Sequence, residues 1–109
     1  MIHEEICTYE VAKLAKEKGF NVPTDFCYEQ NGCLVRCGSI AAPTQSLLQR
    51  WLREEKNIDI VVMPIRPNGY AYTLCGSIHE EDGAMLDRVP QPTYELALED
   101  ALKYALEKL

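Results

Sequence analysis

Two Asn-Gly dipeptides constrain the fold of this chain more than any other feature of its sequence. Each lies between two segments that are rich in apolar and β-branched residues. Asn-Gly is the strongest short-range signal for a two-residue hairpin turn, because both central positions of a type I′ turn need a positive φ. The sequence therefore predicts two β-hairpins, which join residues 26–30 to 33–38 and residues 58–65 to 70–79.

Two-residue turns also predict which residues pair across each hairpin. We expect Tyr28 opposite Val35 in the first hairpin and Met63 opposite Leu74 in the second, both pairs on the core face. The alternative for the second hairpin is a loop longer by one residue, which would shift its register. The other face of the first strand of the second hairpin then carries Ile60, Val62, Pro64 and Arg66. Proline has no N–H to donate to a sheet, so Pro64 predicts an edge strand or a bulge.

Three amphipathic helices alternate with these hairpins. Thr8 and Thr93 are typical N-cap residues for helices over residues 8–18 and 94–109. The middle helix is expected to begin with Pro43 at its first position and to end near Lys56, with Trp51 central in its apolar stripe. Its solvent-facing side is predicted to carry Gln45, Gln49, Arg53 and Lys56.

This order of elements predicts an α+β fold with the arrangement α-ββ-α-ββ-α. Sequential hairpins favour one four-stranded antiparallel sheet, and the three helices are expected to pack mostly on one face of it. Residues 80–92 are polar and contain glycine and prolines, which indicates a loop. The 109 residues are expected to form one domain over 1–109.

Composition and charge exclude several classes of protein. The chain has 17 acidic and 11 basic residues, so its formal charge is −6, which disfavours general binding to nucleic acid. We find no apolar run long enough for a membrane span and no secretory signal. Five cysteines without a dense, regular spacing favour free thiols in the reducing cytosol, so a cytoplasmic protein is expected.

The residues that could carry chemistry do not form a complete site. Cys33 and Cys37 have a metal-like spacing, but a structural zinc usually needs a second ligand pair. Cys7 precedes a helix, but neither His3 nor His79 is placed by the sequence as its base. We therefore predict no catalytic residue, no metal and no cofactor, and an enzyme is the third choice of function.

Two binding functions remain open. The first is a non-enzymatic protein-interaction role, with a homodimer formed through the partly apolar face at Ile60, Val62, Pro64 and Arg66. The alternative is a nucleic-acid or nucleoprotein accessory factor. It would use the mildly basic residues 33–72, where Gln49, Arg53 and Lys56 lie along one helix face.

Residues 42–54 (APTQSLLQRWLRE) resemble a group of small uncharacterised proteins encoded by gut bacteria and by their phages or mobile elements. Residues 10–20 (EVAKLAKEKGF) and 93–99 (TYELALE) are similar to the same group. The three blocks cover about half of the chain and occur in the right order. The resemblance implies a cytosolic setting in a bacterium or phage-infected cell, and it implies no activity, cofactor or site residue.

Overall fold

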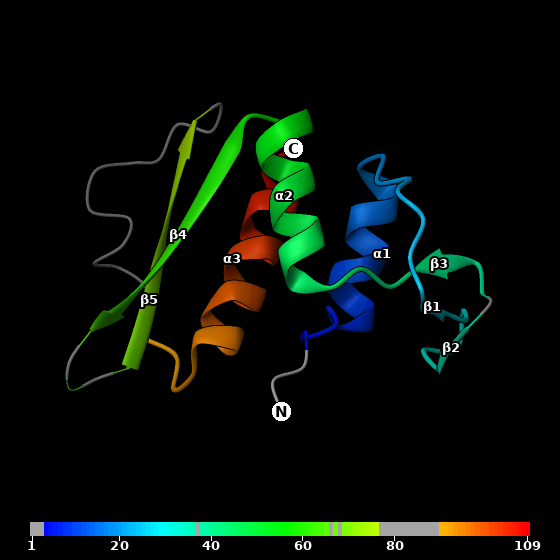
Figure 1. The fold of residues 1–109 in the computed structure, drawn as a ribbon, viewed down its shortest axis with the longest axis horizontal. Coiled ribbons are helices and arrows are strands. Elements are labelled where there is room, and N and C mark those ends of the chain that lie inside the picture. Colours follow the sequence, from blue (N-terminus) through cyan, green and yellow to red (C-terminus); the bar gives the residue numbers. More distant parts are fainter. Residues whose placement is uncertain (1–3, 37, 66, 68, 77–89) are drawn as a thin grey trace.

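Three helices that run in the same direction form the centre of the molecule (Figure 1). The computed structural model describes residues 4–36, 38–65, 67, 69–76 and 90–109. Helix α1 spans Tyr9–Glu17, α2 spans Gln45–Glu55 and α3 spans Tyr94–Glu107. Their N-terminal ends therefore meet at one edge of the molecule, the lower edge in Figure 1. None of the described helices is long and apolar enough to cross a membrane.

A threonine caps the start of each helix. Thr8, Thr44 and Thr93 each accept a hydrogen bond on the side-chain oxygen from the backbone N–H three residues further on. The predicted caps at Thr8 and Thr93 are confirmed. Pro43 does not occupy the first helical position, because Thr44 follows it as the cap and the helix begins at Gln45.

The five strands form two separate antiparallel sheets, so the expected four-stranded sheet is wrong. The first sheet has the order β2-β1-β3, and the second pairs β4 with β5. The three helices do not all pack on the same sheet. Helix α1 contacts β3, whereas α2 contacts β4 and α3 contacts both β4 and β5. The helices thus lie between the two sheets rather than on one face of a single sheet (Figure 1). The strands are β1 Cys27–Tyr28, β2 Leu34–Val35, β3 Ile40–Ala41, β4 Ile58–Ile65 and β5 Gly69–Gly76.

Strand pairing in the first hairpin differs by one position from the prediction. Tyr28 lies opposite Leu34 rather than Val35. The N–H of Glu29 donates to the carbonyl of Cys33 at 2.9 Å, which closes a three-residue loop. Gly32 ends that loop with a φ of 90°. A three-residue loop with glycine at its left-handed position is the next most common hairpin connection after the two-residue turns.

The strand pairing in the second hairpin differs by three positions from the prediction, and this exchanges the predicted faces of β4. Ile60 lies opposite Leu74 and Val62 opposite Tyr72, whereas Met63 faces Ala71. The loop again has three residues, because Ile65 pairs directly with Gly69. Side chains alternate along a strand, so an odd shift moves one whole set to the other face. The predicted extension of the second strand over residues 77–79 lies outside the described residues, as do residues 80–89 of the predicted loop.

The hydrophobic core lies between the helices and the inner face of the β4–β5 sheet. Trp51 is buried there as predicted, with its ring edge-on to Phe20 at a centroid distance of 5.4 Å. The buried aliphatic side chains of this core include Val11, Leu48, Leu52, Ile58, Ile60, Leu74, Leu98, Leu102 and Leu106. The core thus joins all three helices to one sheet, while the other sheet lies on the far side of α1.

Candidate functional site

The residues predicted to form a dimer interface do not share one exposed surface. Ile60 is only 7% exposed and belongs to the core, and Val62 is half-buried and packs against the core. Pro64 is exposed, and Arg66 lies outside the described residues. The register of the hairpin turns the Ile60 and Val62 side chains toward the helices, and an interface at these residues stays a prediction.

The backbone edge of β4 is also protected against pairing with another chain. Tyr70 exchanges both of its backbone hydrogen bonds with Gln91, so it exchanges none with its partner Pro64. By alternation, the backbone groups of Ile60 then point away from β5. The carbonyl of Ile60 accepts from Gln49 Nε2 at 3.1 Å, and Pro64 has no N–H. A capped carbonyl and an edge proline are ways in which proteins block the extension of a sheet.

The three residues suggested for nucleic-acid contact do not form a basic surface. Gln49 is engaged with Ile60, and the Lys56 ammonium lies 5.3 Å from the centre of the Trp51 ring. Arg53 is exposed, but it is flanked in sequence by Glu54. No described feature of α2 therefore collects positive charge for a phosphate backbone.

The described cysteines do not form a metal site. Cys7, Cys27, Cys33 and Cys75 are free thiols. Cys37 and His79 lie outside the described residues, and within the described ranges no three His, Cys, Asp or Glu side chains are placed to hold a metal ion. The absence of a zinc site stays a prediction for the whole chain.

Burial makes Cys7 an unreactive thiol. Its side chain is fully buried, and this burial, together with the nearby Glu99 carboxylate, raises the pKa of Cys7 far above its ordinary value. The Tyr28 hydroxyl donates to the Cys7 carbonyl at 2.7 Å, and burial likewise raises the pKa of Tyr28. A nucleophilic cysteine needs the opposite shift, so Cys7 is a structural residue.

Glu99 joins the N-terminal ends of all three helices. One of its oxygens accepts from the Thr8 N–H at 2.9 Å and from the Thr8 hydroxyl at 2.8 Å. Its other oxygen accepts from Gln45 Nε2 at 2.9 Å. The same nitrogen donates to the Glu95 carbonyl at 2.9 Å. A carboxylate is favourable here because the positive ends of the helix dipoles converge.

Gln45 is therefore an internal residue rather than a surface one. It is 4% exposed, although the helix pattern predicted it on the solvent-facing side of α2. The contact between the first turns of α2 and α3 covers it, and no single-helix pattern reports such a contact. Its two hydrogen bonds satisfy the buried amide nitrogen, as burial of a polar group requires.

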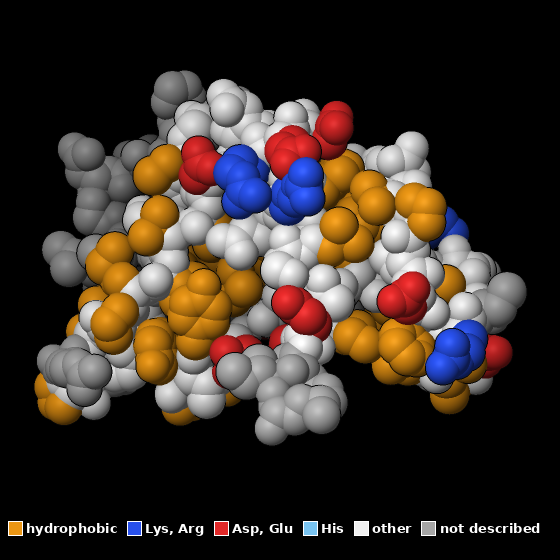
Figure 2. All heavy atoms as spheres, in the orientation of Figure 1, with side chains coloured by type: hydrophobic (Ala, Val, Ile, Leu, Met, Phe, Trp, Pro, Cys, Tyr) orange, Lys and Arg blue, Asp and Glu red, His pale blue; other side chains and the backbone are white. Residues whose placement is uncertain are grey.

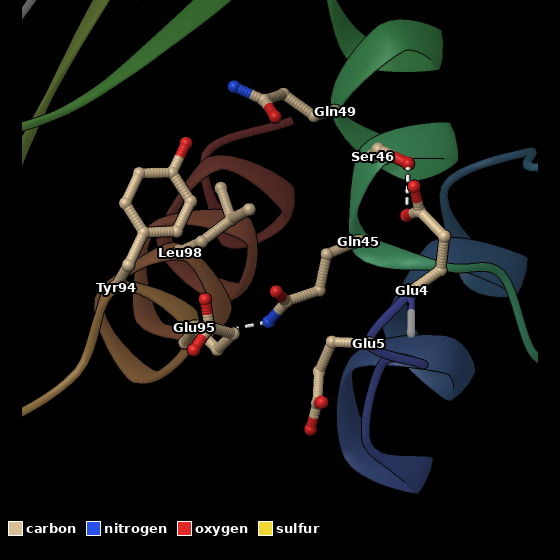
Figure 3. Close-up of a pocket in the computed structure, with 8 residues that line it drawn as sticks. All are labelled: Glu4, Glu5, Gln45, Ser46, Gln49, Tyr94, Glu95 and Leu98. Carbon is tan, nitrogen blue, oxygen red and sulfur yellow. Dashed lines mark hydrogen bonds between the residues drawn. The ribbon is translucent and has the colours of Figure 1, made fainter. Parts of the chain in front are cut away.

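An acidic cleft opens beside Gln45, between the first turns of α2 and α3. It has a volume of about 360 Å³, and Figure 3 shows the residues on its walls. Glu4 accepts from the Ser46 hydroxyl at 2.7 Å, while Glu5 and Glu95 carry carboxylates with no described hydrogen-bond partner. The lining consists of Glu4, Glu5, Gln45, Ser46, Gln49, Tyr94, Glu95 and Leu98. Among the described residues, no Lys, Arg or His lines this cleft.

Two large side chains are exposed on the first turn of α3, beside the acidic cleft. Tyr94 is 41% exposed and lies on the cleft wall, and Leu96 is 50% exposed in the small hollow that adjoins it. The Tyr94 ring is held edge-on to Tyr70 at a centroid distance of 6.1 Å. Carboxylates beside an aromatic ring are the groups that bind an ammonium or guanidinium ion.

The sequence did not single out Glu4, Glu5, Tyr94, Glu95 or Glu99 as site residues, and it placed Gln45 only on the polar stripe of α2 that was considered for nucleic-acid contact. The available signal is the repeated Thr-Tyr-Glu at positions 8–10 and 93–95, which marks two helix starts with a threonine followed by an acidic first turn. That these starts lie at the same edge depends on the direction of each helix in the fold.

No protein-family model, curated protein or solved structure matches this chain. Its resemblance to small proteins of gut bacteria and phages thus stays a prediction, and its function must be inferred from its own residues.

Proposed function

We propose that this chain is a non-enzymatic protein-interaction protein that binds a cationic segment of a partner at the acidic cleft between α2 and α3. The observation that carries the proposal is the combination of three glutamates and an exposed tyrosine around one cleft without a described cation. Among the described residues, no cation supplies the counter-charge of this site. A Lys or Arg side chain of a partner supplies it.

The charge distribution of the molecule supports a cationic partner. The described ion pairs, Arg50 with Glu54 and Lys103 with Glu10, lie outside the cleft. Figure 2 shows Lys and Arg beside carboxylates near the upper end of α2, and further carboxylates near its lower end. The net charge of −6 adds a long-range attraction for a basic partner and a repulsion for nucleic acid.

A protein partner fits the cleft better than a metal ion or a reacting substrate. The described residues contain no group placed to hold a metal, and the cleft walls carry no cysteine or histidine as nucleophile or base. A guanidinium can instead bind carboxylates through several N–H groups and stack on a tyrosine ring. We place this interaction in the cytosol of a bacterium or phage-infected cell, in line with the free thiols and with the resemblance of residues 42–54.

Titration calorimetry with an acetylated and amidated peptide of five alternating Lys and Arg residues tests the proposal. We expect salt-sensitive binding that falls at least about tenfold, or about 1.4 kcal/mol, in the Glu5→Gln/Glu95→Gln variant. Glu17→Gln/Asp59→Asn is the matched control, because it removes two exposed carboxylates that do not line the cleft. Equal losses in both variants would show only a general charge effect and would contradict the proposal.

A further inference from the structure

A second hollow lies on the other side of the first turn of α2. It has a volume of about 400 Å³, and the acidic cleft and this hollow share Glu4 as a wall residue. Its walls are mostly apolar, and Glu4 and Asp25 supply its carboxylates. The lining residues are Glu4, Ile6, Pro23, Thr24, Asp25, Phe26, Ala42, Thr44 and Leu47.

This hollow combines apolar walls with two carboxylates. Ile6, Phe26 and Leu47 are half-buried, so each keeps part of its apolar surface exposed to water. No described Lys or Arg lines the hollow, and the nearby Arg36 guanidinium lies over the Phe26 ring at 5.7 Å. An anionic occupant would meet two carboxylates, with no cation among the described lining residues, whereas an apolar side chain on a cationic segment meets favourable contacts.

We infer that this hollow receives a bulky apolar side chain from the same partner segment whose cation enters the acidic cleft. The inference rests on the proposed function, and it names the partner chemistry: a leucine-like residue close in sequence to Lys or Arg. Continuity through Glu4 supports one ligand for both hollows. Figure 2 shows the same pattern, with hydrophobic side chains on both sides of α2 and carboxylates between them at its lower end.

Matched peptide probes test this inference. The five-residue Lys and Arg peptide is extended by Leu-Gly at its N-terminus or by Gly-Leu at its C-terminus, and serine replaces leucine in the two controls. We expect one leucine peptide to bind about tenfold more tightly than its serine control, because burial of a leucine side chain is worth about that factor. The Leu47→Ala variant should remove this gain and leave the affinity of the serine peptide unchanged.

Methyl NMR on the unmodified protein gives a second measurement that does not depend on the stability of Leu47→Ala. The methyl signals of Ile6 and Leu47 should shift with the leucine peptide and not with its serine control. Equal affinities and unshifted methyl signals, with binding that still depends on Glu5 and Glu95, would overturn this inference and leave the proposed function standing. Binding of neither peptide would overturn both.

Discussion

The two hairpins have loops of the same length but very different strands. Each loop has three residues. Gly32 is the last residue of the first loop and Gly69 directly follows the second loop, and both have a positive φ. The first hairpin has strands of two residues that are half-buried or exposed, and the second has strands of eight residues with a buried inner face. The turn thus fixes where a chain reverses, whereas packing against helices decides how far the strands continue.

Shortening one buried side chain of the long hairpin should have the largest effect. Leu74 is 3% exposed and lies opposite Ile60, so Leu74→Ala should lower the free energy of unfolding by about 2–5 kcal/mol. Leu34 in the short hairpin is 45% exposed, and Leu34→Ala should change it by less than about 0.5 kcal/mol. Urea unfolding measures both, and similar losses would show that the short hairpin is part of the same core.

The loop glycines offer a second contrast between the hairpins. A Cβ at Gly69 would meet the Gln91 carbonyl oxygen, whereas a Cβ at Gly32 would meet only the Tyr9 ring at 3.9 Å. Gly32→Ala should therefore cost only the strain of a left-handed residue, about 1–2 kcal/mol. Gly69→Ala must also move the backbone and should cost about 3 kcal/mol or more. Thermal unfolding of the two variants checks the order, and a reversed order would contradict it.

High pH should weaken the attachment of the short hairpin to the core. The pKa values of Cys7 and Tyr28 are both raised by burial, so the folded protein holds both protons more tightly than the unfolded chain. Their contribution is complete below the unfolded pKa values, about 8.5 for Cys and 10 for Tyr, and is lost as pH rises above them. Each group then lowers stability by up to about 1.4 kcal/mol per pH unit.

Urea midpoints between pH 7 and pH 10.5 measure this loss. Cys7→Ala should flatten the decline that begins near pH 8.5, and Tyr28→Phe should leave that first part unchanged. A decline of the same steepness in Cys7→Ala would show that another group titrates.

The smallest expected effect is a difference in the labelling rates of the cysteine thiols. Cys33 in the short hairpin and Cys75 in β5 are exposed, whereas Cys7 is buried under the helix starts. In native protein at neutral pH, a disulfide reagent should modify Cys33 and Cys75 rapidly and Cys7 only after unfolding. Peptide mapping assigns each modified thiol, and rapid labelling of Cys7 would show that the Glu99 contacts open readily.

Local sequence signals predicted elements better than they predicted pairing. The caps at Thr8 and Thr93, the burial of Trp51 and the existence of both hairpins follow from side-chain chemistry within a few residues. The loop predicted at Gly32 is one residue too short. The pairing predicted for the second hairpin differs by three positions from the observed pairing. Turn residues tolerate neighbouring loop lengths at similar cost, so the buried face selects the register.

The acidic cleft shows the same limit for the candidate site. The glutamates near the starts of α1 and α3 are visible in the sequence, but their meeting beside α2 depends on three helices that point the same way. Gln45 illustrates why: its pattern within α2 is polar and solvent-facing, yet α3 covers it and accepts its hydrogen bonds. No periodicity within one helix contains information about its neighbour.

By itself, the sequence determined the three helices, the caps at Thr8 and Thr93, the two chain reversals and the excess of negative charge, because each depends on residues close together in the chain or on composition. Only the tertiary structure decided that the strands form two sheets, which face of β4 is buried and which carboxylates share a cleft. These depend on contacts between distant segments, such as Thr8 with Glu99, whose energies compete across the whole chain.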